Sequence, residues 1–302
     1  MRASLTLKLS VVVVVLLAAC GGTGSSATTV PLKPKITISS TTDPTSELIA
    51  EIYGQALEKA QFRVARKKAF DTPDALFAAV EGNEVQLSGM TTQVLFALVQ
   101  AQTSSTDPLP NTTSDQAAAI VKGLSKALKI GVASTAEDKD VVFCAKTFTD
   151  ANTIVTLTDL GTKPGTATLA APDGFDTNKP MGAATLKDAY KIEFKSVVPT
   201  TIDKTVDAVT AGTADCGVGR SADPRLAVAT LTVLNDDKAL VPNNVILPLV
   251  SSLAAADDVM TIVDNVSAQL TTAALRTLMQ RLKVDGASPE LVANEFTAHS
   301  GT

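Results

Sequence analysis

Apolar positions recur along this chain with two alternating periods, which predict short buried strands and amphipathic helices in turn. Between residues 44 and 60 the apolar side chains keep the spacing of one helical face. Asp43 and Pro44 supply a cap and a first-turn residue for that helix. The first part of the chain is thus predicted to run strand, helix, strand, helix, strand, at residues 36–38, 44–60, 62–65, 74–81 and 85–89. This order favours a parallel sheet with helices on its faces.

The alternation resumes after a polar loop at residues 103–115. Further helices are predicted at residues 116–129, 183–190, 202–211, 271–283 and from 288 onward, with a helix or turn near 148–160. Further strands are predicted at residues 130–133, 140–145, 167–171, 192–197, 214–219, 231–234 and 245–250. We therefore predict an α/β fold of two lobes joined near residues 131 and 220. Lobe I comprises residues 35–131 and a return segment, 221–302, and lobe II comprises residues 132–220.

The N-terminal residues predict export and a lipid anchor. A basic start leads into an apolar run that is shorter than the roughly 20 residues of a transmembrane helix, so residues 1–19 have the pattern of a signal peptide. Leu17-Ala18-Ala19-Cys20 resembles the bacterial lipobox, which implies cleavage before Cys20 and lipid on that residue. The alternative is an ordinary secretory signal with an incidental cysteine. Residues 20–34 are predicted to be a flexible tether that anchors an extracytoplasmic domain to the bacterial cell membrane.

The charge of the chain narrows its choice of partners. Its 26 basic and 31 acidic residues give a formal net charge of −5. Removal of residues 1–19 would take away Arg2 and Lys8 but no acidic residue, so the exported protein would carry −7. This negative charge argues against nucleic acid or an anionic lipid surface as a partner.

Two cysteines remain besides Cys20. Cys144 and Cys216 each lie in an apolar, strand-like run. An exported protein meets an oxidising compartment, where these two residues could form a disulfide. Two buried free thiols are the alternative, because the sequence does not give the distance between their Cα atoms.

Signatures of catalysis are scarce. His299 is the single histidine and lies among the last four residues, so a Ser-His-Asp triad or a histidine-based zinc site is not expected. The chain has no Gly-x-Ser-x-Gly elbow and no phosphate-loop signature. Gly217-Val218-Gly219 lacks the rest of a dinucleotide fingerprint and fits a closely packed strand end. We therefore expect no enzyme activity, no catalytic residue, no metal and no cofactor.

The segment from Ser39 to Asp43 is the best candidate for a binding site. It joins the C-terminal end of a predicted strand to the start of a helix, where ligands of open α/β sheets bind. Free backbone N–H groups at a helix start favour an anion or a carboxylate. The alternative is that Asp43 only caps its helix.

Several segments in the same order resemble the glycine betaine/choline (osmoprotectant) substrate-binding proteins of ABC importers. They are ITISSTTDPTSELIAEIYGQALEKAQF (36–62), DCGVGRSADPRL (215–226), VLNDDKALVP (233–242), Pro248-Leu249-Val250 and SPELVANEF (288–296). The resemblance implies a type II periplasmic-binding-protein fold, in which a hinge joins two lobes and the ligand lies in the cleft between them. It also implies a receptor for a small molecule that docks on a membrane permease. We expect the receptor to be a monomer.

The chain departs from this family where the resemblance places an aromatic cage for a quaternary ammonium group. The corresponding positions carry Thr41-Thr42-Asp43, the segment 88–93 and Arg220. Because the cage acts through cation–π attraction, we expect an altered ligand that is polar or flat and uncharged, or that carries a carboxylate. The candidate ligand-binding residues are Ser40, Thr41, Thr42, Asp43, Ser88, Met90, Thr91, Thr92, Asp140, Phe143, Arg220, Ser221 and Asp223.

Two other classes of protein remain as alternatives. A surface lipoprotein could keep the fold and serve as an interaction or scaffold protein, in which case side chains would be expected to fill the cleft. An extracytoplasmic enzyme would need two carboxylates that converge in the cleft.

Overall fold

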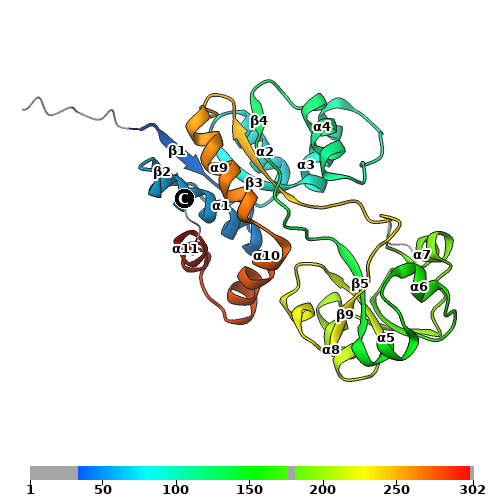
Figure 1. The fold of residues 1–302 in the computed structure, drawn as a ribbon. Helices are drawn as coiled ribbons and strands as arrows, with labels where there is room; N and C mark the ends of the chain where they lie inside the picture. Colours follow the sequence, from blue (N-terminus) through cyan, green and yellow to red (C-terminus); the bar gives the residue numbers. More distant parts are fainter. Residues whose placement is uncertain (1–32, 176–180, 300–302) are drawn as a thin grey trace, which may run out of the picture. The chain divides into compact units, whose positions relative to one another are not determined.

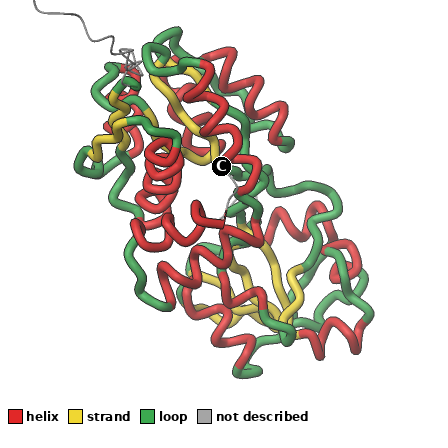
Figure 2. Tube along the Cα trace, turned by 60° about the vertical axis from the view of Figure 1, so that its left-hand side comes forward, coloured by secondary structure: helices red, strands yellow, loops and turns green. Residues whose placement is uncertain are grey.

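The computed structural model describes residues 33–175 and 181–299. The predicted signal peptide, Cys20 and nearly all of the predicted tether lie outside these residues. Two five-stranded sheets form the centres of two lobes, and helices pack around each sheet (Figures 1 and 2). None of the helices in the described ranges combines the length and the apolar character needed to cross a membrane.

The sheet of lobe I has the strand order β2-β1-β3-β10-β4. Its strands are β1 (Lys35–Ile38), β2 (Arg63–Arg66), β3 (Leu87–Thr91), β4 (Leu128–Ile130) and β10 (Ile246–Ser251). β1 is parallel to β2 and β3, as expected, but β10 runs antiparallel to both of its neighbours. The parallel arrangement predicted for the first three strands is confirmed. No direction was predicted for β10, which is reversed because it enters from lobe II and not through a helical crossover within lobe I.

Helices supply the rest of lobe I. They are α1 (Pro44–Lys59), α2 (Pro73–Glu81), α3 (Thr92–Thr103), α4 (Thr113–Gly123), α9 (Asp257–Gln269), α10 (Thr272–Met279), the π-helical turn η3 (Gln280–Val284) and α11 (Pro289–His299). The apolar face predicted for α1 is buried, and Tyr53 on that face donates or accepts a hydrogen bond with Ser267 of α9 at 3.0 Å. No element was predicted at the positions of α3 and α9, and the helix predicted at residues 116–129 runs into residues that form β4.

The sheet of lobe II has the order β7-β6-β8-β5-β9. Its strands are β5 (Asp140–Ala145), β6 (Thr168–Pro172), β7 (Ser196–Thr200), β8 (Cys216–Arg220) and β9 (Leu231–Val233). Its helices are α5 (Lys146–Asn152), α6 (Leu157–Gly161), α7 (Ala183–Tyr190), η1 (Ile202–Lys204), α8 (Thr205–Thr210) and η2 (Pro224–Ala227). β5 is antiparallel to β8 and β9, so in each lobe the strand that follows a crossing from the other lobe is the reversed one.

A disulfide and a closely packed ring hold β5 against β8. Cys144 lies opposite Cys216 in this ladder, and the two are joined by a disulfide. The ring of Phe143 crosses β8, where a Cβ atom added at Gly217 would lie 2.6 Å from its Cζ atom. Glycine is thus required for this contact, and the Gly-Val-Gly segment is a closely packed strand, as the sequence analysis interpreted it.

Two hydrogen-bonded segments connect the lobes. The Asp138 N–H donates to the carbonyl of Asn244 at 2.9 Å, and the Ser134 N–H donates to that of Ile246 at 2.9 Å. The sequence analysis placed the second crossing near residue 220, but β9 pairs with β5, and Leu234 and Val241 are buried in a lobe II cluster. Periodicity marks residues 231–234 as a strand without indicating the sheet to which it belongs. We propose that lobe II runs from residue 140 to residue 241.

Candidate functional site

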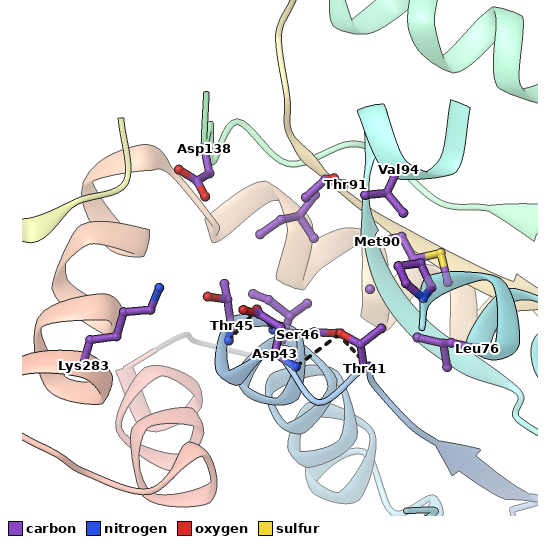
Figure 3. A pocket seen from close by; sticks show the side chains of 14 residues that line it. Thr41, Asp43, Thr45, Ser46, Leu76, Met90, Thr91, Val94, Asp138 and Lys283 are labelled. Atoms are coloured by element: carbon purple, nitrogen blue, oxygen red, sulfur yellow. Dashed lines mark hydrogen bonds between the residues drawn. The ribbon is translucent and has the colours of Figure 1, made fainter. Parts of the chain in front are cut away.

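A pocket of about 310 Å³ opens at the start of α1 and the end of β3, and we name it the α1 pocket (Figure 3). It is lined by Thr41, Asp43, Thr45, Ser46, Ile49, Pro73, Leu76, Gly89, Met90, Thr91, Val94, Asp138, Ile246 and Lys283. The strand-to-helix junction predicted from the sequence is therefore one wall of a real pocket. Asp138 comes from the first crossing segment and Lys283 from η3, so segments far apart in the sequence complete it.

The N–H groups at the start of α1 are already hydrogen-bonded within the helix cap. The Asp43 carboxylate accepts hydrogen bonds from the Thr45 N–H at 2.9 Å and the Ser46 N–H at 3.0 Å. Pro44 has no N–H group to offer. The expectation that free N–H groups would bind an anion here is therefore not met, and Asp43 caps the helix, as the alternative stated. This turn therefore presents hydroxyl groups to the pocket, together with the second carboxylate oxygen of Asp43.

A second pocket of about 330 Å³ shares Thr45, Asp138 and Lys283 with the first, so the two meet. We name it the arginine pocket. Its remaining lining residues are Asp203, Arg220, Ala222, Asp223, Pro224, Arg225, Met279 and Val284. The pocket thus joins residues of η3 and α10 in lobe I to residues of lobe II.

Both arginines of this pocket are matched by carboxylates. Arg220 contacts Asp138 with Nε at 3.1 Å and Asp140 with Nη1 at 2.9 Å. Burial lowers the pKa of Arg220, but these two carboxylates outweigh it and raise the pKa above its ordinary value. Arg225 forms a two-pronged pair with Asp223, at 3.0 Å from Nε and 2.6 Å from Nη2. Neither guanidinium is a free positive charge.

Lys283 differs from both arginines. Its ammonium forms no hydrogen bond or ion pair with any residue in the described ranges. Figure 3 shows its side chain extending toward the part of the pocket that Asp138 and Thr45 occupy. The sequence analysis missed Lys283, because a lysine near the end of a predicted helix carries no signal that would place it beside α1.

The predicted ligand-binding residues divide into those that line one of the two pockets and those that do not. Thr41, Asp43, Met90, Thr91, Arg220 and Asp223 line one of them. Ser40, Thr42, Ser88, Thr92, Asp140, Phe143 and Ser221 line neither.

Physical roles within the fold account for most of that second group. Phe143 is fully buried in the core of lobe II, and Ser88 is buried within β3. The Thr92 hydroxyl donates to the carbonyl of Asn243 at 3.4 Å, and the Ser221 hydroxyl donates to that of Glu137 at 2.9 Å. Both hydroxyls therefore fasten segments where the lobes are joined. Asp140 reaches the site only through Arg220.

Aromatic side chains and metal ligands are both missing from this site. No phenylalanine or tyrosine of the described ranges lines the α1 pocket or the arginine pocket. Nor does the described part of the chain contain a group of three or more His, Cys, Asp or Glu residues suited to a metal ion. The site can therefore offer hydroxyl groups, apolar contacts, the Lys283 ammonium and the Asp203 carboxylate, but no stack of aromatic faces.

Comparisons with known proteins give one family and one fold. The model of a family described as the substrate-binding domain of ABC-type glycine betaine transport systems matches residues 34–299. A solved glycine betaine/carnitine/choline ABC transporter protein superposes with a TM-score of 0.76 at 18% identity, covering 87% of this chain and 97% of its own. Apo YehZ from Escherichia coli superposes with a TM-score of 0.74 at 18% identity, covering 88% and 99%. Lactococcal OpuAC, in its closed form with glycine betaine, gives 0.50 at 13% identity, covering 88% and 96%. No curated protein sequence matches the chain.

Proposed function

The chain belongs to the family of substrate-binding domains of ABC-type glycine betaine transport systems, and from this premise we propose that its cleft binds a solute other than a quaternary amine. Members of this family are extracytoplasmic receptors that bind a small molecule and interact with an ABC permease, and the family is not one of enzymes. The two-lobed fold of this chain is that of the type II periplasmic binding proteins.

The observation that carries the proposal is the lining of the two pockets. Hydroxyl, apolar and charged side chains line them, without an aromatic side chain among the described residues. Each cation–π contact contributes roughly 0.5–2 kcal/mol, most when it is desolvated. The loss of three or four such contacts would weaken a trimethylammonium ligand by orders of magnitude, at about 1.4 kcal/mol per tenfold change.

The open cleft favours a receptor over a scaffold. A scaffold protein of this fold would be expected to fill its cleft with side chains, whereas the α1 pocket and the arginine pocket have volumes of about 310 and 330 Å³. Each exceeds the roughly 30 Å³ share of a water molecule in the liquid about tenfold. We further propose that lipid on Cys20 anchors the receptor to the cell membrane and that the receptor acts as a monomer.

Thermal unfolding against a panel of solutes tests the proposal. The protein is the mature chain with Cys20→Ser, which prevents lipidation, and the panel contains glycine betaine, choline, carnitine, proline, sugars and flat aromatic compounds. A ligand present at 100 times its dissociation constant stabilises the folded state by about 2.7 kcal/mol, which shifts the unfolding temperature visibly. We expect no shift with glycine betaine or choline. A shift with either would refute the proposal and assign the usual ligand of the family.

A further inference from the structure

We propose that the ligand is an organic acid with a compact apolar body, and that the Lys283 ammonium binds its acidic group. This inference rests on the proposed function, because it takes the α1 pocket to be the place where the solute lies. It assigns one residue as the determinant of specificity and one chemical class to the ligand.

The α1 pocket has a clear polarity from one end to the other. Figure 3 shows Leu76, Met90 and Val94 together at one end, and Lys283 and Asp138 at the other. Leu76 is fully buried and Met90 is 6% exposed, so this apolar wall is part of the core of lobe I. The hydroxyl-bearing side chains lie between the two ends, at Thr41, Thr45, Ser46 and Thr91. A solute that matches this order has an apolar body, hydrogen-bonding capacity and one charged end.

The charges that line this pocket determine the sign of that end. The Asp43 carboxylate is stabilised by two N–H groups at the start of α1, and the Asp138 carboxylate by Arg220. Lys283 is the charged lining residue for which no described residue supplies a partner. Lys283 is exposed in the cleft, so its ammonium is accessible to a ligand, and a ligand carboxylate would form a charge-assisted hydrogen bond with it.

The neighbouring arginines are not free to bind a ligand carboxylate in the same way. Each guanidinium is bound to at least one carboxylate, and Asp207 adds a further acidic group 3.7 Å from Arg225. A ligand acid would have to displace these carboxylates to reach either arginine. The lobe II wall of the arginine pocket is therefore unfavourable for an anion, which places the acidic group of the ligand beside Lys283.

The backbone that carries Lys283 is held in place independently of any ligand. Lys283 lies in the π-helical turn η3, a departure from regular helix that recurs at functional sites. Arg281 in the same turn pairs with Asp285 and with Glu295 of α11, each at 2.8 Å. These pairs fix the turn from within lobe I, so replacing the Lys283 side chain should leave the turn intact.

A rival role for Lys283 is an ion pair with Asp203 across the arginine pocket, which both residues line. Such a pair would hold the lobes together whatever the ligand's charge. It would therefore make the same contribution to the binding of an acid and of its uncharged amide. The ligand-binding role, in contrast, affects the acid alone.

The test compares acids with amides of the same shape. The probes are hexanoate and hexanamide, isovalerate and isovaleramide, and phenylacetate and phenylacetamide, titrated calorimetrically into the mature Cys20→Ser chain. The variants in this background are Lys283→Met, Lys283→Arg and Asp203→Asn. Lys122→Met on the exposed surface of α4 is the matched control. Thermal unfolding without ligand checks that every variant folds.

We expect at least one acid to bind at least tenfold more tightly than its amide. Lys283→Met should abolish that preference and leave the affinity for the amide unchanged, Lys283→Arg should keep most of it, and Lys122→Met should have no effect. The inference is overturned if no acid binds, if the amides bind as well as the acids, or if Lys283→Met and Asp203→Asn weaken acid and amide alike. Tight binding of an amide without preference for the acid would refute this inference but leave the proposed function standing. Binding of choline or glycine betaine would refute the proposed function as well.

Discussion

Removal of the Cys144–Cys216 disulfide should destabilise lobe II selectively. The bond closes a loop with a sequence separation of 72 residues, which contains β6, β7 and all the helices between β5 and β8. For a loop of this length, chain entropy predicts a loss of about 15 cal/mol/K from the unfolded state, or about 4.4 kcal/mol at 25 °C. Both cysteines are fully buried, so their replacement by alanine also removes packing contacts. We expect Cys144→Ala/Cys216→Ala to lower the free energy of unfolding of lobe II by about 3–5 kcal/mol.

The tyrosines make it possible to observe each lobe separately. The chain has no tryptophan and two tyrosines, of which Tyr53 lies in the core of lobe I and Tyr190 in that of lobe II. In a Tyr53→Phe background, tyrosine fluorescence during urea unfolding reports lobe II, and in a Tyr190→Phe background it reports lobe I. Each measurement compares the cysteine variant with the intact disulfide in the same background.

We expect a large loss in the free energy of unfolding reported by Tyr190 and a small loss in that reported by Tyr53. Unfolding of each tyrosine variant with its native cysteines in the presence of a reductant provides the control, because the reductant opens the loop without replacing either cysteine. Equal losses at the two tyrosines would refute the assignment of the effect to lobe II. A loss at Tyr190 below about 1 kcal/mol would show that the loop-entropy reasoning does not hold for this bond.

Three further changes test particular contacts. Gly217→Ala should destabilise lobe II by about 1–3 kcal/mol in thermal unfolding, because its new methyl group meets the Phe143 ring. Adding Phe143→Leu should recover part of that loss, and strictly additive losses of the two changes would contradict the contact. Asp43→Ala should cost lobe I about 1 kcal/mol in urea unfolding through loss of the helix cap, whereas Asp43→Asn should cost less, and equal costs would argue against capping. Burial raises the pKa of Tyr53, so its contribution to stability is fully present below about pH 10 and is lost as the pH rises above that value. Tyr53→Phe should therefore flatten the alkaline fall in the free energy of unfolding, and an unchanged slope would exclude Tyr53 as its source.

The local elements were predictable where a single periodic pattern and its caps agreed. Helix α1 is the best case, since the predicted apolar face is buried and Asp43 and Pro44 stand where a helix start requires them. Strands β5, β6 and β8 were also anticipated to within two residues at each end. In these segments local preference and the final packing favour the same structure.

Properties that depend on pairing between distant segments were not predictable. The sequence marks β9 and β10 as strands, yet their sheet and direction depend on where the chain crosses between the lobes. The same limit applies to Phe143, which was expected to reach the cleft. Its side chain is buried because two glycines 74 and 76 residues further along the chain, Gly217 and Gly219, leave room for its ring. An alternating strand pattern does not indicate which of its two faces will meet such glycines.

The expected charges of the site were revised most by the structure, and this revision bears directly on the ligand. Arg220 drew attention in the sequence because it replaces an aromatic residue of the related family, and a free guanidinium in the cleft would itself favour an acid. In the structure Asp138 and Asp140 match that charge from the neighbouring chain segment, so Arg220 gives no reason to expect an acidic ligand. The unmatched positive charge belongs to Lys283, more than 230 residues away from the helix start that it faces. An acidic ligand was one of the alternatives that the sequence left open. Lys283, and not Arg220, is now the reason to favour it, so a variant of Lys283 is the one that tests it.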